Sequence, residues 1–201
     1  MRWKTAKCVT ALMLLCASTL GYTASTYRFR LDPVSSSVDA KVAFMGIGNR
    51  KAYFPALRGN VTLSPEQMNQ IDLNVTIDAT QLTADDGTTT GRLKGKDFFY
   101  VDKFPTVRFE GTQLSMTNST NGIVRGNLTA RGVTRPVALN VAFSTPPADA
   151  KGKDAIRLTG VTTINRKEFG VSWSRAMDGG GYVVGDDVKI TIELELIKQT
   201  S

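Results

Sequence analysis

The sequence contains no histidine and only two cysteines among its 201 residues. Without histidine, the chain cannot form a Ser-His-Asp or Cys-His catalytic arrangement, an HExxH zinc site or a histidine switch near neutral pH. Both cysteines, Cys8 and Cys16, precede residue 26, so removal of that segment leaves no disulfide, thiol nucleophile or thiolate metal ligand. We therefore expect a fold that is stabilised by packing alone, with no cofactor and no metal site.

Long apolar runs are also scarce, and the clearest one lies at the start of the chain. Three basic residues precede an apolar run from Val9 to Leu20, and small residues follow it, which is the layout of a cleavable secretory signal. The run is shorter than the roughly 20 residues that span a bilayer as a helix, so a permanent anchor is the weaker alternative. Lipid attachment at Cys16 is a second weaker alternative. We predict a signal peptide over residues 1–25 and a periplasmic or secreted bacterial domain over residues 26–201.

The charge balance of the remaining chain is only mildly basic. Removal of three basic residues with the signal changes the formal charge from +7 to +4. Nucleic-acid binding requires a stronger and more clustered basic surface, and the basic residues of this chain are scattered. We therefore predict no nucleic-acid partner.

Apolar residues after residue 26 recur mostly at every second position, which is the spacing of a β-strand with one apolar face. The last such segment is the clearest, because Val188, Ile190, Ile192, Leu194 and Leu196 alternate with polar residues. About eight or nine strands of this kind predict one antiparallel sheet, which closes into a barrel or folds into a sandwich. The one helical segment expected lies near residues 84–100.

Three stretches carry a family resemblance: 91–109 (GRLKGKDFFYVDKFPTVRF), 126–137 (GNLTARGVTRPV) and 164–171 (INRKEFGV). They resemble motifs of the YceI-like proteins, which are described as periplasmic polyisoprenoid-binding proteins. The resemblance spans nearly the whole chain after the signal. It implies an all-β fold, a single antiparallel lipocalin-like β-barrel of about eight strands.

The chain departs from that family at three positions where histidines are usual, which here hold Ser35-Ser36, Phe44 and Arg92. If those histidines contact a ligand head group in relatives, this chain must use other residues or bind a different ligand. An arginine can bind phosphate with two parallel hydrogen bonds, so Arg92 keeps an anionic head group open.

The candidate ligand-binding residues combine the aromatic and apolar side chains near the strand ends with three polar ones. They are Val42, Phe44, Phe54, Leu93, Phe98, Phe99, Phe104, Phe109, Phe169, Trp173, Arg92, Asn165 and Arg166. The apolar members alternatively form an ordinary core, because a barrel filled by its own side chains shows the same alternation. Asn165 and Arg166 alternatively anchor a turn by hydrogen bonds, and Arg92 alternatively belongs to an exposed helical face.

A barrel lumen can hold a folded isoprenoid or acyl chain without a base, metal or nucleophile, since each buried methylene contributes about 0.8 kcal/mol. We therefore predict a non-enzymatic, exported protein that sequesters or transports a polyisoprenoid, an isoprenoid quinone or another long-chain lipid. Transient membrane contact and a homodimer are compatible with this role. The main alternative is a stress-related or adhesion module acting through an exposed apolar patch. A lipid-modifying enzyme that uses Glu168 and Arg166 is the third hypothesis.

Overall fold

The computed structural model describes residues 26–64, 66–67, 69–178 and 180–199, so the predictions for residues 1–25 concern a segment outside them. The strands are β1 (Tyr27–Leu31), β2 (Ser37–Phe44), β3 (Gly48–Phe54), β4 (Leu57–Leu63), β5 (Gln70–Asp78), β6 (Thr83–Ala84), β7 (Thr106–Met116), β8 (Asn121–Ala130), β9 (Val133–Phe143), β10 (Ala155–Asn165) and β11 (Val184–Lys198). The helical elements are α1 (Gly87–Lys94) and the 3₁₀ turns η1 (Ala79–Gln81), η2 (Pro147–Asp149) and η3 (Arg166–Phe169). Within this described part, none of the helices has the length and apolar character needed to cross a membrane.

The strands form where apolar and polar side chains alternate, because successive side chains of a strand point to opposite faces. In β11, Leu194 and Leu196 are buried, whereas Glu193 is exposed. In β5, every second residue from Ile71 to Ile77 is buried. The apolar face of each strand therefore points to the interior of the fold, and the polar face points to water.

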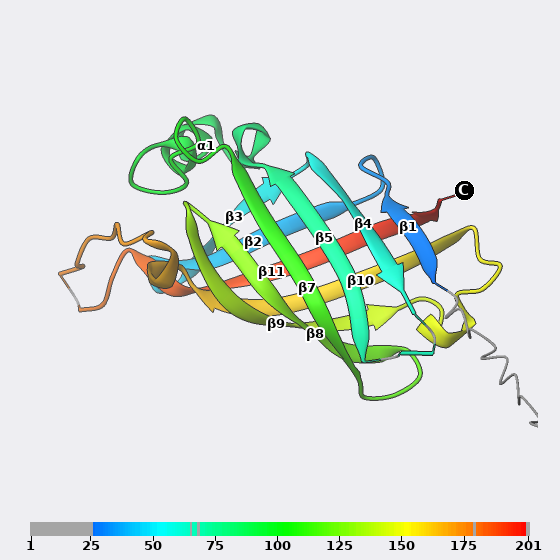
Figure 1. Cartoon of the computed structure of the whole chain (residues 1–201). Helices are drawn as coiled ribbons and strands as arrows, with labels where there is room; N and C mark the ends of the chain where they lie inside the picture. Colours follow the sequence, from blue (N-terminus) through cyan, green and yellow to red (C-terminus); the bar gives the residue numbers. More distant parts are fainter. Residues whose placement is uncertain (1–25, 65, 68, 179, 200–201) are drawn as a thin grey trace, which may run out of the picture.

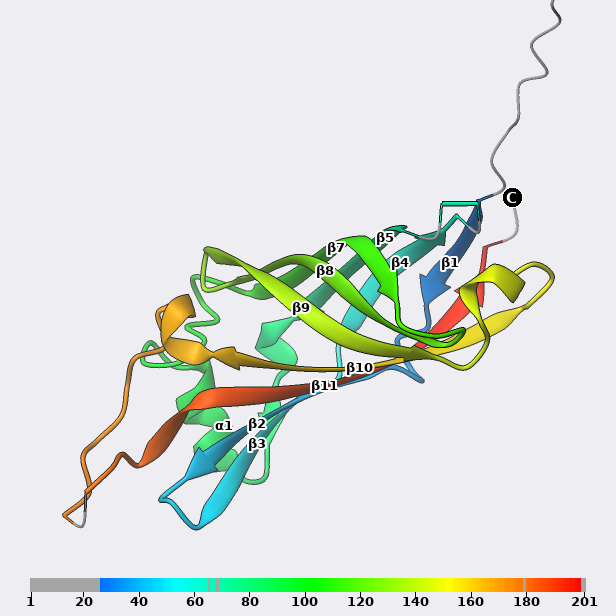
Figure 2. The same ribbon diagram turned by 90° about the horizontal axis from the view of Figure 1, so that it is seen from below.

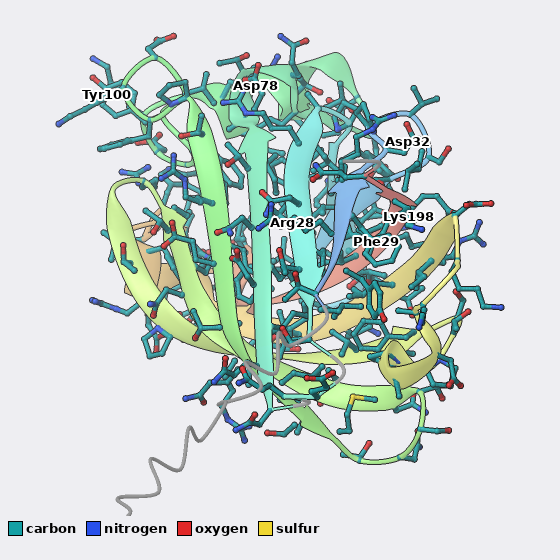
Figure 3. The ribbon with its side chains drawn as sticks, turned by 45° about the vertical axis from the view of Figure 1, so that its right-hand side comes forward. Arg28, Phe29, Asp32, Asp78, Tyr100 and Lys198 are labelled. Carbon is teal, nitrogen blue, oxygen red and sulfur yellow. The ribbon has the colours of Figure 1, made fainter. Side chains whose placement is uncertain are left out.

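Eight strands close into a barrel. Their order is β1-β4-β5-β7-β8-β9-β10-β11, and β1 pairs with β11 to complete the ring. At this closure Phe29 on β1 is the register partner of Lys198 on β11, and the two lie side by side in Figure 3. The pairings are antiparallel throughout. The predicted antiparallel barrel of about eight strands is confirmed, and so is the helical segment within residues 84–100.

The remaining strands extend the sheet beyond the ring. β11 is long enough to pair with β1 near its C-terminal end and with β2 from Val184 to Glu193. β2 pairs in turn with β3, and the resulting hairpin projects at the end of the barrel away from the C-terminus (Figures 1 and 2). α1 lies at this same end of the barrel (Figure 1). Figure 3 shows Asp78 and Tyr100 along the rim of this end.

Two capping aspartates hold the short helical elements of this rim. Asp86 accepts hydrogen bonds from the backbone N–H and the hydroxyl of Thr89, both at 2.7 Å, and these bonds lower the pKa of Asp86. Asp78 accepts hydrogen bonds from the hydroxyl and the backbone N–H of Thr80, at 2.6 and 3.0 Å, and these bonds lower the pKa of Asp78. Both contacts require an ionised carboxylate for their full strength.

The lowered pKa values of Asp78 and Asp86 lead to a prediction of how the free energy of unfolding depends on pH. A carboxylate whose pKa is lower in the folded state stabilises the fold above its unfolded pKa of about 3.9, and this contribution is lost as pH falls through the folded pKa. Since no histidine titrates, we expect the free energy of unfolding to stay nearly constant from about pH 5 to pH 7 and to decrease below about pH 4. Urea unfolding at a series of pH values measures this. The double variant Asp78→Asn, Asp86→Asn should show a weaker acid dependence, and a transition centred near pH 6 would contradict the prediction.

Candidate functional site

A narrow cavity lies inside the end of the barrel that carries α1 and the β2–β3 hairpin. Its lining comprises Val38, Ala40, Val42, Arg50, Lys51, Ala52, Phe54, Leu73, Val75, Ile77, Leu93, Phe98, Phe99, Val107, Phe109, Leu128, Ala130, Val137, Leu139, Thr162, Ile164, Arg166, Phe169, Val171, Val184, Val188, Ile190, Ile192 and Leu194. The volume of the cavity is about 180 Å³. This small volume is bordered on β11 by residues from Leu194 to Val184, so the space is long and narrow and suits a slender ligand rather than a round one.

Only part of the barrel interior is hollow. On β11, Ile190, Ile192 and Leu194 line the cavity, whereas the next inward residue, Leu196, belongs to the solid core. The same division occurs on β5, where Ile71 packs in the core away from the cavity. The floor of the cavity is therefore formed at the level of Leu194, and the half of the barrel near the chain termini is filled by its own side chains.

Small inward side chains contribute to this division, although the cavity wall also carries phenylalanines. The filled half contains Phe29 and Phe143, which are 0% and 3% exposed, among several fully buried leucines. The cavity wall instead includes the small side chains of Ala40, Ala52 and Ala130. Ala40 and Ala52 are direct register partners on β2 and β3, so two short side chains meet at one level of the wall. Tight packing is normal in protein interiors, and small side chains at these positions leave room that the neighbouring side chains do not fill.

Aromatic side chains from two loops border the mouth. Phe99 packs edge-on against Phe54 of β3, and Phe98 packs against Trp173, each with ring centres 5.5 Å apart. Phe98 and Trp173 come from the segment after α1 and the segment after η3, so their contact connects the two loops. Arg131 in the β8–β9 turn donates hydrogen bonds to the carbonyls of Lys96 and Phe98 and fixes the first of these loops.

That turn requires glycine at position 132. Gly132 has a φ of +74°, and a Cβ atom there would lie 2.9 Å from the Phe104 ring. A side chain would therefore strain the backbone and also displace Phe104. Phe104 packs edge-on against Tyr100 with ring centres 6.0 Å apart, so it supports the loop from outside the cavity.

Four polar side chains occur in the lining, and two of them are engaged within the protein. The Thr162 hydroxyl donates to the carbonyl of Ala138 at 2.9 Å. Arg166 is 5% exposed and directs all its N–H bonds to protein acceptors, which are the carbonyls of Val171, Trp173, Val184 and Gly185 and the carboxylate of Asp186. Burial lowers the pKa of this guanidinium. Arg166 therefore ties the η3 loop to β11 and has no N–H bond left for a ligand.

Arg50 and Lys51 are the other two polar residues of the lining, and both are exposed at the mouth. The Arg50 guanidinium lies 4.6 Å from the centre of the Phe44 ring. Neither side chain forms an ion pair within 4 Å among the described residues. These two cations are therefore available to a polar group at the end of a ligand chain.

Eight of the thirteen predicted ligand-binding residues line the cavity. They are Val42, Phe54, Leu93, Phe98, Phe99, Phe109, Phe169 and Arg166. Phe44, Phe104 and Trp173 lie outside the lining and support its rim through the contacts described above. Arg92 is exposed on α1, and Asn165 caps η3 by accepting a hydrogen bond from the Lys167 N–H at 2.9 Å.

The alternating pattern indicates the apolar strand faces but does not single out most of the residues that line the cavity. Val75, Val137 and Ile192 line the cavity, yet their alternation is the same as that of residues in the solid half. Arg50 had a detectable signal, because Arg50, Ala52 and Phe54 share one face of β3. Among the described residues, no group of three or more acidic, histidine or cysteine side chains is placed to hold a metal ion.

Comparison with known proteins gives consistent matches over most of the chain. A family model described as the YceI-like domain matches residues 29–196. A UPF0312 protein of Staphylococcus aureus (strain bovine RF122) is 27% identical over 170 residues, which cover 83% of this chain and 95% of that protein. The crystal structure of BcnA from Burkholderia cenocepacia is similar with a TM-score of 0.70 and 23% identity, over 82% of this chain and 98% of that one. A polyisoprenoid binding domain from Saccharophagus degradans, implicated in plant cell wall breakdown, is similar with a TM-score of 0.63 and 14% identity, over 85% and 98% of the two chains.

Proposed function

Because this chain belongs to the YceI-like family, we propose that it binds one isoprenoid or similar long-chain lipid in the cavity and carries it outside the cytoplasm. The observation that carries the proposal is the narrow apolar cavity, open at one end of an otherwise solid barrel. The polyisoprenoid-binding neighbour has the same fold, which supports an isoprenoid as the ligand. The signal-like layout of residues 1–25 supports export and a periplasmic location.

The energetics favour a long chain. Each methylene that moves from water into an apolar site contributes about 0.8 kcal/mol, so a lipid tail gains affinity with every carbon that fits. The floor at Leu194 limits how much tail can enter, and the lining residues of β11 from Leu194 to Val184 follow roughly 30 Å of strand. Binding of this kind needs no reacting group, which agrees with a role as a carrier rather than an enzyme.

The polar end of the ligand belongs at the mouth. Arg50 and Lys51 line the mouth and form no ion pair with any residue that the structure describes, whereas Arg166 is fully engaged by the protein. A phosphate, pyrophosphate or quinone oxygen at the mouth would accept hydrogen bonds from these cations. Arg50 and Lys51 thus supply the head-group contacts for which the chain has no histidine.

The experiment is direct identification of the bound lipid. The full chain is expressed, exported and purified without detergent, and native mass spectrometry is combined with solvent extraction. We expect one lipid molecule per protein molecule, and we expect its tail to be an isoprenoid or a similarly long apolar chain. A protein that carries no lipid, and that binds none when incubated with isoprenoid alcohols or quinones, would contradict the proposal.

A further inference from the structure

The tip of the β2–β3 hairpin exposes large apolar side chains at a position that is usually polar. Ile47 is 99% exposed and Met45 is 53% exposed. Turn tips normally hold glycine, asparagine, aspartate or serine, and single exposed apolar residues elsewhere need no explanation. Here two of them occupy one three-residue turn, on either side of Gly46 with its φ of +70°. This turn therefore presents its apolar side chains outward.

A row of lysines crosses the sheet behind this tip. Lys41 on β2 is the register partner of Lys51 on β3 and of Lys189 on β11. Like charges directly opposite each other destabilise a sheet. None of the three lysines takes part in an ion pair within 4 Å between the residues that the structure describes. The row therefore does not serve the stability of the barrel, and its charge is complementary to an anionic surface.

The apolar tip and two of the three lysines of the row, Lys41 and Lys51, belong to one segment, the β2–β3 hairpin. From Ala40 to Ala52 the hairpin carries three cations, Lys41, Arg50 and Lys51, and no acidic residue. Within the described part of the chain, β6 pairs with just Ala52 and Tyr53 of β3, so the edge of β3 nearer the tip has no strand partner there.

The hairpin also forms the lip of the cavity. Val42 and Arg50 of the hairpin line the cavity mouth. The backbone N–H of Met45 donates to the carbonyl of Val183 at 2.8 Å, which joins the tip to the loop that carries Tyr182, 60% exposed. In Figures 1 and 2 this loop and the hairpin project at the same end of the barrel. A surface that contacts this tip therefore lies against the opening of the cavity.

We propose that the β2–β3 hairpin docks on an anionic lipid bilayer, with Met45 and Ile47 inserted among the lipids and the lysine row against the head groups. Apolar side chains that enter the interface and basic residues beside them are the two contributions that bind a peripheral protein to a membrane. The docked orientation places the cavity mouth at the bilayer, where a lipid can pass between the two. This last step rests on the proposed lipid-carrier function, whereas docking itself does not.

The first test asks whether vesicle binding depends on the apolar side chains of the hairpin tip or on any exposed apolar side chain. Flotation measures binding to vesicles made of equal parts phosphatidylcholine and phosphatidylglycerol. We expect the double variant Met45→Ser, Ile47→Ser to bind at least about tenfold more weakly. The matched control is Val34→Ser, since Val34 is 91% exposed in the β1–β2 loop, which lies apart from the hairpin, and its removal should leave binding unchanged.

The second test distinguishes the effect of the lysine row from the effect of the protein's net charge. The double variant Lys41→Ser, Lys189→Ser, whose two lysines lie outside the cavity lining, should lose about fivefold in affinity for each lysine, and the loss should disappear in high salt. The control Lys151→Ser, Lys153→Ser removes the same charge from an exposed loop before β10 and should leave binding unchanged. Vesicles of phosphatidylcholine alone should bind the wild type weakly.

Two results would overturn the docking proposal. One is equal vesicle binding by the wild type, the tip variant and the lysine-row variant. The other is a wild-type dimer that these variants convert to monomer with vesicle binding unchanged, because the tip would then be a contact between two copies of the chain. Bound lipid is measured in every variant, so a protein that docks but holds no lipid contradicts the carrier function alone, and one that holds lipid but does not dock contradicts the docking alone.

Discussion

Replacement of Ala40 by tryptophan is expected to remove lipid binding while the barrel stays folded. Ala40 lies on the cavity wall next to Ala52, its register partner on β3, and it is only half-buried, so the larger side chain can enter the empty space without displacing the core. If the indole ring excludes about four methylene-sized groups of the ligand, the loss is about 3 kcal/mol, or roughly a hundredfold in affinity. The lipid recovered per protein by solvent extraction measures this effect.

A control on the outer face makes the result interpretable. Ala138→Trp places the same side chain on β9, between the inward residues Val137 and Leu139, at an exposed position. This variant should keep its lipid, and both variants should unfold at a guanidinium concentration close to that of the wild type. If Ala40→Trp keeps a full complement of lipid, the cavity is not the binding site.

The strands were predictable from the sequence because each strand carries its own signal, the alternation of apolar and polar residues. The alternation of β11 and β5 follows directly from which residues must face the core, and the burial of Leu194 and Ile71 agrees with it. Closure into a ring was not predictable from the pattern alone. It depends on a short pairing of β1 with β11, from Leu31 to Phe29, between segments at the two ends of the domain. The family resemblance, not the periodicity, favoured the barrel over the sandwich.

The cavity was predictable only in part, for a related reason. Aromatic residues near the mouth, such as Phe98, Phe99 and Phe169, were named because they stand out in the sequence, and they do line the cavity. Whether an inward aliphatic residue borders empty space depends on the size of the side chains on the neighbouring strands. The pairing of Ala40 with Ala52 decides this at one level, and only the register reveals it.

The second large expected effect concerns Arg166. We expect Arg166→Met to lower the free energy of unfolding by about 3–5 kcal/mol, because several carbonyls in a buried region lose a charged donor and each such loss costs about 1–3 kcal/mol. The guanidinium holds Val171 and Trp173 on one side and Gly185 on the other, with N–O distances of 2.7–2.9 Å. Methionine fills similar space but leaves these carbonyls without a donor, and an unsatisfied buried acceptor is destabilising.

The part of the chain that loses stability in Arg166→Met distinguishes a structural role of Arg166 from a contact with the ligand. Hydrogen exchange should increase most in the segment between η3 and β11, because Arg166 connects its two ends. Arg157→Ala is the matched control, since its guanidinium pairs with Glu195 at 3.0 Å but is largely exposed, and exposed pairs contribute about 0–1 kcal/mol. Arg166→Lys keeps the charge but has too few donors for the five acceptors, so its stability should lie between those of the wild type and Arg166→Met. If Arg166→Met instead unfolds like the wild type and loses only bound lipid, the side chain serves the ligand rather than the fold.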